Sequence, residues 1–274
     1  MRVRSSVTRP SLPQKDQRKE IMLARLKTKV GIAIRNLRFG NARCYDPVLH
    51  FHSNLYLRHN ARRLEHLASL GIPVSGLSVL EVGAGIGDHS HFYIDRGCRI
   101  TITEARTENL CHLRRLYPKF SVQVLDMESP SHIEGSPFDL VHCYGLLYHL
   151  SNPRQALDFM SRNAKSMLFL ETCVSFGDKE EVNNVGETQI DPTQAYSGTG
   201  CRPTRAWVFK ELHRLFECVY LPRTQPCHEE FPIDWTSPEK HKASLQRAIF
   251  IASREKLENE MLLPFLPPMQ TRQV

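Results

Sequence analysis

Short apolar runs alternate with helical patterns through the middle of this chain, and this alternation constrains its fold more than any other feature. Runs of five or six residues with the character of buried strands lie at 78–82, 98–103, 120–125, 138–143 and 166–170. Helical spacing follows three of these runs, to about residue 97, over 106–117 and over 153–163. Strands that alternate with helices pair in parallel, with right-handed crossovers. The order therefore predicts an α/β fold built on a doubly wound sheet.

A glycine-rich turn comes directly after the first run. Gly83, Gly85 and Gly87 lie between that run and the helical segment that follows it. Glycine is required where the backbone turns sharply and where a ligand approaches a position that has no Cβ. Glu104 comes directly after the second run, 21 positions after Gly83. A carboxylate there can accept both hydroxyls of an adenosine ribose, so the pattern predicts a nucleoside site.

The spacing and the charge of this turn help to distinguish a cofactor that contains a pyrophosphate from a zwitterionic or cationic one. A turn that binds a pyrophosphate usually has two residues between its second and third glycines. This chain has only Ile86 between Gly85 and Gly87. Glu81, before the first glycine, would repel a phosphate and would suit the ammonium group of a methionine. The electrostatics favour a zwitterionic or cationic cofactor, with a nicotinamide dinucleotide as the alternative.

Over residues 75–252 the chain resembles the class I S-adenosylmethionine-dependent methyltransferases. The E-x-G-x-G-x-G turn at 81–87, the acid Glu104, the segment 125–127 and the segments 138–141 and 144–150 follow the order of that family's motifs. The resemblance implies S-adenosyl-L-methionine as cofactor. The cofactor-binding residues that it implies are Glu81, Gly83, Gly85, Gly87, Glu104, Asp126, Met127 and Tyr144.

The resemblance also completes the predicted sheet. A helix over 204–215 separates two late strands, 217–221 and 248–252, from the earlier ones, and the late strands match the family's final antiparallel hairpin. We therefore expect a mostly parallel, seven-stranded sheet with helices on both faces and a late antiparallel strand. The connection between the late strands, 226–238, contains Pro, His, Glu and Trp and is expected to be exposed, with 228–230 as a solvated acidic turn.

Two residues near the end of the fourth run are candidates for catalysis. His149 is the candidate general base and Tyr148 is the second candidate, because oxygen and nitrogen nucleophiles can need a proton acceptor. Each assignment has a structural alternative: His149 as a packing residue, Tyr144 as plain core, and Asp126 as a helix cap. No metal site is expected, since His50 and His52 have no evident third ligand.

These residues lead to a functional hypothesis: methyl transfer from S-adenosylmethionine to an O or N atom of a small-molecule acceptor. One alternative is an RNA methyltransferase that uses the basic N-terminal region as a phosphate clamp. Residues 1–70 carry 15 Lys/Arg and 4 Asp/Glu, a net +11, but residues 71–274 carry 21 and 25, a net −4. The acidic body disfavours nucleic acid as the partner. A non-catalytic module that binds the cofactor is the other alternative.

The N-terminal region is expected to be a helical extension of the domain. Leu and Ile at steps of three and four predict a basic amphipathic helix over 17–38, which could touch a membrane surface or RNA or pack on its own domain. A second helical pattern covers 54–70. The eight cysteines form no CxxC pair and are expected to be reduced thiols in a cytoplasmic protein. The expected division is 1–16 flexible basic arm, 17–74 helical extension, 75–254 cofactor-binding domain with a lid at 174–203, and 255–274 C-terminal tail.

Overall fold

The computed structural model describes residues 47–187, 194, 195 and 197–273. The basic arm and the amphipathic helix expected over 17–38 lie outside the described residues. Two helices open the described chain, α2 (Pro47–Phe51) and α3 (Asn54–Ser69). The N-cap of α3 is Ser53, whose side chain accepts a hydrogen bond from Tyr56 N. The helical pattern expected over 54–70 is therefore present as α3.

A single large sheet runs through this part of the chain. Its strand order is β3-β2-β1-β4-β5-β10-β8-β11. The first five strands in sequence are β1 (Ser78–Val82), β2 (Arg99–Glu104), β3 (Ser121–Val124), β4 (Phe138–Tyr144) and β5 (Ala164–Cys173). All of these pair in parallel. The α/β class and the parallel core of the sheet are confirmed.

The late strands are β8 (Cys218–Pro222), β10 (Arg247–Ser253) and β11 (Leu262–Leu263). Strand β10 is antiparallel to both β5 and β8, so the expected late antiparallel strand is confirmed. Strand β11 adds an eighth, two-residue strand at the β8 edge. It comes from the segment 255–274, which the sequence predicted as a tail. The same segment supplies β12 (Thr271–Arg272), which pairs with β9 (Thr224–Gln225).

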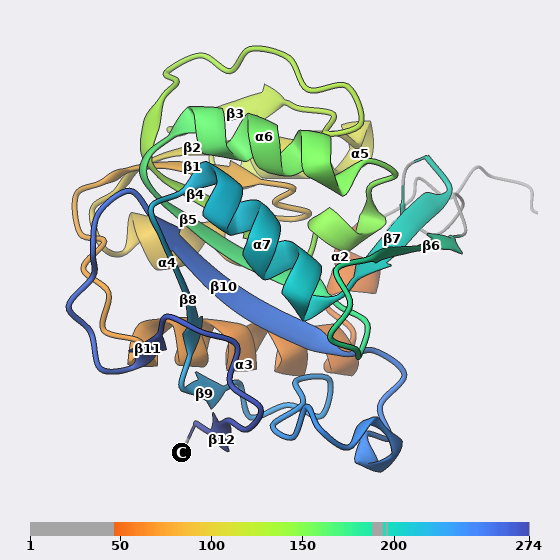
Figure 1. Ribbon diagram of the computed structural model, residues 1–274. Helices are drawn as coiled ribbons and strands as arrows, with labels where there is room; N and C mark the ends of the chain where they lie inside the picture. The colour runs from red at the N-terminus through yellow and green to blue at the C-terminus, as the bar shows by residue number, and fades with distance from the viewer. Residues whose placement is uncertain (1–46, 188–193, 196, 274) are drawn as a thin grey trace, which may run out of the picture. The chain divides into compact units, whose positions relative to one another are not determined.

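Helices cover both faces of the sheet. Figure 1 shows α6 (Pro153–Asn163) and α7 (Arg205–Leu215) side by side across one face. One group of buried side chains joins these two helices to the sheet, and another joins α3, α4 (Ser90–Ile94) and α5 (Thr107–Leu116) to it. Leu80, Leu168 and Phe250 are fully buried. Burying a side chain of this size contributes about 1.5–3 kcal/mol.

Three further segments differ from the prediction. The helix expected to run to residue 97 is only the five residues of α4, because the glycine turn occupies the chain before it. The lid expected over 174–203 contains an antiparallel hairpin, β6 (Val182–Gly186) and β7 (Thr199–Pro203). The connection 226–238 is not simply exposed, since Phe231 and His228 are buried. Among the described residues, no helix is long and apolar enough to cross a membrane.

Candidate functional site

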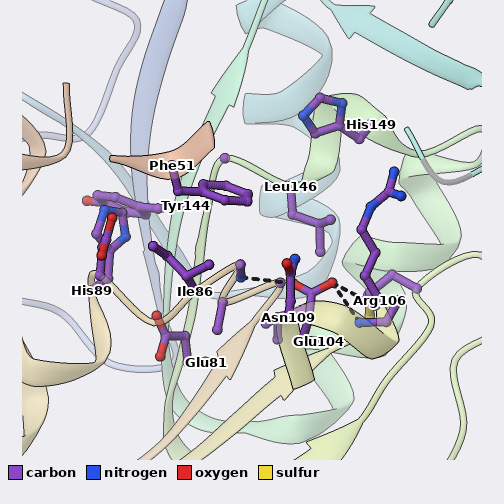
Figure 2. Close-up of a pocket in the computed structure, with 18 of the residues that line it drawn as sticks. Phe51, Glu81, Ile86, His89, Glu104, Arg106, Asn109, Tyr144, Leu146 and His149 are labelled. Carbon is purple, nitrogen blue, oxygen red and sulfur yellow. Dashed lines mark hydrogen bonds between the residues drawn. The ribbon is translucent and has the colours of Figure 1, made fainter. Parts of the chain in front are cut away.

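A pocket lies at the carboxyl ends of β1, β2 and β4. The register of the sheet brings its residues together, since Glu81 pairs with His142 and Tyr144 pairs with Glu171. Figure 2 shows Glu104 and Arg106 at one end of this pocket and Glu81, His89 and Tyr144 at the other. In open α/β sheets, ligands bind at this edge of the strands. The pocket therefore lies where the sequence placed the nucleoside site.

The glycine turn forms one wall of the pocket through its backbone. Gly83, Gly85 and Gly87 all have positive φ, which only glycine adopts without strain. A Cβ on Gly83 would lie 2.8 Å from Cδ2 of Leu146, across the pocket wall. The three glycines are thus required by conformation, and a Cβ on Gly87 would be still more crowded than one on Gly83, at 2.5 Å from Cε2 of Tyr117.

The carboxylate of Glu104 is fixed at one end of the pocket. Its Oε2 accepts a hydrogen bond from Gly85 N at 2.8 Å, and its Oε1 accepts from Ala105 N and Arg106 N, both at 2.9 Å. Burial raises the pKa of Glu104, and the backbone donors oppose that rise. The group is held in one orientation before any ligand arrives, as a ribose-binding acid must be.

Glu81 lies at the opposite end and is only 2% exposed. Ser90 Oγ donates a hydrogen bond to its Oε2. Burial raises the pKa of Glu81 to about 8, because the charged form loses its hydration. A buried carboxyl with this pKa is suited to a cationic partner, which would stabilise its ionised form.

Three further polar side chains of the pocket each have a buried atom without a hydrogen-bond partner. These atoms are Tyr144 Oη, Arg63 Nε and His89 Nε2. All three side chains line the pocket and are at most 8% exposed. Leaving a buried donor unpaired costs about 1–3 kcal/mol, so such groups indicate a polar ligand. The sequence predicted Tyr144 here but missed Arg63 and His89, because Arg63 comes from α3, outside the motif region.

Asp126 and Met127 line the same pocket beyond Glu104. The Asp126 carboxylate accepts a hydrogen bond from Glu128 N at 2.9 Å, so it orders the turn that follows β3. In the described chain this turn leads into a loop, and the alternative of a helix cap does not apply. Met127 is 4% exposed and forms an apolar surface there.

Tyr148 and His149 belong to a short 3-10 helix, Leu147–His149, after β4. Arg247 Nη2 donates to the Tyr148 hydroxyl at 3.3 Å, and burial raises the pKa of Tyr148. His149 Nδ1 hydrogen-bonds to Glu187, which also accepts from Ala195 N and Arg202 Nη2. Burial lowers the pKa of His149, against the opposing effect of Glu187. Sequence reasoning missed Glu187, since it lies in the segment without pattern.

Beyond Tyr148, a chain of buried ion pairs closes the pocket. Glu171 is fully buried and pairs with Arg63 at 2.7 Å and with Arg247 at 3.1 Å. Arg247 also pairs with Glu230 at 2.7 Å. We expected a solvated acidic turn over 228–230. This expectation is wrong for Glu230, because the carboxylate of Glu230 pairs with Arg247. The pairing balances the charges, so the wall is polar and rigid.

One group in the described part of the chain has the composition of a metal site. Ligand atoms of Glu81, His89 and His142 lie within 4.8 Å of one another. Both nitrogens of His142 already have partners, Tyr93 Oη at 2.8 Å and His89 Nδ1 at 3.4 Å. Burial lowers the pKa of His142 to about 3, so this ring is neutral. No sequence pattern predicted this group.

Residues 79–166 match the family model of the methyltransferase domain. This part of the chain is therefore similar in sequence to methyltransferase domains. Among solved structures, the N-terminal domain of EvdMO1, crystallised in the presence of S-adenosylhomocysteine and D-fucose, is 20% identical, with a TM-score of 0.56 over 71% of this chain and 82% of that one. An S-adenosylmethionine-dependent methyltransferase from Mesorhizobium loti is 14% identical, with a TM-score of 0.51 over 72% of this chain and 100% of that one.

No curated protein sequence matches the chain. The solved structures show the fold, and the family model shows the domain. The resemblance to the class I S-adenosylmethionine-dependent methyltransferases is therefore confirmed for this methyltransferase domain, without assignment to a subfamily.

Proposed function

We propose that this methyltransferase domain binds S-adenosylmethionine and transfers its methyl group to an oxygen or nitrogen atom of a small-molecule acceptor. The observation that carries the proposal is the Glu104 carboxylate, fixed by three backbone N–H groups in the pocket beside the glycine turn. A carboxylate in this position accepts the two hydroxyls of a ribose. The EvdMO1 domain, whose structure contains S-adenosylhomocysteine, supports the same class of cofactor.

The pocket residues suggest an orientation for the cofactor. We assign the ribose to Glu104 and the adenine to the surface formed by Asp126 and Met127. The methionine then lies along the backbone of Gly83, Gly85 and Gly87. Glu81 is the partner of its ammonium, and the unpaired donors of Tyr144, Arg63 and His89 receive its carboxylate.

This assignment uses Glu81 and His89 for the cofactor rather than for a metal ion. We therefore propose that transfer needs no metal and that it continues in the presence of a chelator. We keep 75–254 as the proposed cofactor-binding domain, to which α3 adds Arg63 of the pocket, and we propose that the β6–β7 hairpin forms one side of the acceptor site.

S-adenosylmethionine, when bound, would supply a methyl carbon to which an acceptor lone pair bonds while the C–S bond breaks and the neutral thioether S-adenosylhomocysteine leaves. The chain's own contribution is to hold the acceptor in line, exclude water and remove a proton. We assign the base role to Nε2 of His149, since Glu187 holds Nδ1 and leaves the neutral ring with one free acceptor nitrogen. Tyr148 keeps its proton, because burial raises its pKa, so it positions rather than deprotonates.

A small acceptor fits the charges better than a nucleic acid. The ion pairs of Glu171 and Glu230 neutralise Arg63 and Arg247 beside the pocket, which leaves no excess of positive charge for phosphates. The D-fucose in the EvdMO1 crystals supports a small polar acceptor. The seven cysteines of the described region are free thiols, which supports a reducing compartment such as the cytoplasm.

The test is a screen for transfer with isotopically labelled S-adenosylmethionine and a metabolite extract, in the presence of a chelator. We expect a product heavier by one labelled methyl group. His149→Asn should lower turnover by about 10²- to 10⁴-fold, as loss of a general base does. His213→Asn, an exposed histidine on α7, is the matched control. Cofactor binding without any methylated product would favour the non-catalytic alternative.

A further inference from the structure

A second hollow, about 480 Å³ in volume, lies outside the pocket described above. The residues after β5, the N-terminal end of α7, and the segments 235–238 and 266–268 form its walls. None of the described residues that line it also lines the first pocket. A hollow of this size is in the range of small-molecule sites, about 300–1,000 Å³. Its lining contains one residue that points to a ligand.

Arg205 lines the hollow and is only 6% exposed. Its Nη2 donates to the carbonyl oxygen of Pro267 at 2.9 Å, but its Nε is buried without a hydrogen-bond partner. Across the described ranges, no carboxylate oxygen comes within the 4.0 Å of an ion pair with this guanidinium. A buried charge is normally paired, because its desolvation is otherwise uncompensated. Arg205 therefore makes no close ion pair with any described residue, and the charge of Asp178 acts on it only from a greater distance.

Aromatic side chains stand beside this arginine. The guanidinium lies 4.0 Å from the ring centroid of Trp235, which restricts its orientation. Phe176 contacts Trp235 at a centroid distance of 5.4 Å, and both rings line the hollow. Arg205 is also the first residue of the 11-residue helix α7, where the helix dipole favours an anion. The hollow thus places the oriented guanidinium of Arg205 next to the apolar surface of Phe176 and Trp235.

We propose that this hollow is a second ligand site, which binds an oxyanion group through Arg205 and an apolar or aromatic portion of the same ligand against Phe176 and Trp235. A carboxylate and a phosphate both match the guanidinium fork. This inference does not depend on the proposed methyl transfer, because the two sites share no lining residue.

Asp178 gives the proposal a test that does not disturb the core. It is exposed, lines the same hollow, and interacts electrostatically with Arg205. An incoming anion would be repelled by its charge. Asp178→Asn should therefore strengthen binding of an anion, whereas loss of an ordinary surface charge should not.

The experiment is a ligand-observed NMR titration of the full chain with benzoate, phenyl phosphate and neutral benzamide, with S-adenosylhomocysteine added to occupy the first pocket. We expect one or both anions to bind and benzamide not to bind. The two anions show whether a carboxylate or a phosphate is preferred. Arg205→Gln should weaken binding by about tenfold or more. Asp178→Asn should tighten it by about two- to fivefold.

Lys210→Gln is the matched control, since it removes an exposed charge from α7 away from the hollow, where Lys210 pairs with Glu180. It should leave the affinity unchanged. Equal binding of benzamide, or an affinity that neither Arg205→Gln nor Asp178→Asn alters, would overturn the proposal. The outcome for S-adenosylhomocysteine is read separately, so a failure of the methyl-transfer proposal would not be mistaken for a failure of this one.

Discussion

At the scale of single residues, we expect cofactor binding to depend most on Glu104. Its carboxylate accepts three backbone hydrogen bonds and still lines the pocket. We expect Glu104→Gln to weaken S-adenosylhomocysteine binding by roughly 10- to 100-fold, because hydrogen bonds to a charged group contribute about 1.5–3 kcal/mol. Isothermal titration calorimetry measures this change.

Asp139→Asn is a suitable control for Glu104→Gln. Asp139 is also a strand carboxylate, but it bonds to Ser78 N and Oγ at the opposite end of β1. Asp139→Asn should therefore alter the free energy of unfolding without altering the affinity for S-adenosylhomocysteine. Unchanged affinity in folded Glu104→Gln would mean that the ribose does not bind here.

Glu81 should give the chain a specific dependence on pH. Burial raises its pKa from 4.5 to about 8, so between these values the folded chain holds a proton that the unfolded chain releases. This contribution to the free energy of unfolding is complete below pH 4.5 and disappears as the pH rises through about 8.

The glutamine side chain of Glu81→Gln stays neutral at every pH. The variant should therefore not lose the free energy of unfolding that the parent chain loses as the pH rises. Without cofactor, we expect the variant to gain on the order of a few kcal/mol relative to the parent chain between roughly pH 5 and pH 8, since each pKa unit corresponds to about 1.4 kcal/mol. Urea denaturation of the variant and of the parent chain at about pH 5 and about pH 8 measures their free energies of unfolding. Glu65→Gln, at an exposed position of α3, should show no such gain. Parallel pH profiles for Glu81→Gln and the parent chain would contradict the raised pKa.

At the scale of elements, the β6–β7 hairpin is joined to the 3-10 helix after β4. A Cβ on Gly200 in β7 would lie 2.6 Å from the carbonyl oxygen of Tyr148 and 2.6 Å from Oε1 of Glu187. The second of these groups is the one that orients His149. The packing of the hairpin and the geometry of the candidate base are therefore linked.

We expect Gly200→Ala to destabilise the chain by about 1–3 kcal/mol, as overpacking does, and to lower turnover as well. Gly186 lies in the paired strand β6, and a Cβ added there would meet no atom within 4 Å, so Gly186→Ala is the matched control. Urea midpoints and initial rates of both variants give the comparison. Equal midpoints would show that the hairpin can shift to relieve the contact.

At the scale of the whole molecule, the pocket joins residues from α3, β1, β2 and β4, so its ligand should stabilise all of them together. At about 100 times its Kd, a ligand adds about 2.7 kcal/mol. For a chain of this size we expect S-adenosylhomocysteine to raise the unfolding temperature by about 5–10 °C. Differential scanning calorimetry measures the shift. A comparable rise with a nicotinamide dinucleotide, and none with S-adenosylhomocysteine, would reverse the cofactor assignment.

The sequence by itself determined the parallel core of the sheet and placed the glycine turn and Glu104 at its carboxyl edge. Strand runs, the glycine turn and Glu104 are local patterns, because a buried parallel strand needs a continuous apolar run and a tight turn needs glycine. Segments with weak local patterns, 174–203, 226–238 and 255–274, were described wrongly or incompletely. Nothing local reveals the hairpin, the burial of His228 and Phe231, or strand β11.

Only the tertiary structure decided which side chains complete the site. Arg63, Glu171 and Arg247 come from α3, β5 and β10, and none of them stands in a motif, yet they form one buried network. The same holds for Glu187 beside His149 and for the unpaired Arg205 in the second hollow. The physical reason is that pairing and desolvation of a charge depend on neighbours brought together by packing, whereas a strand or a glycine turn depends on neighbours along the chain.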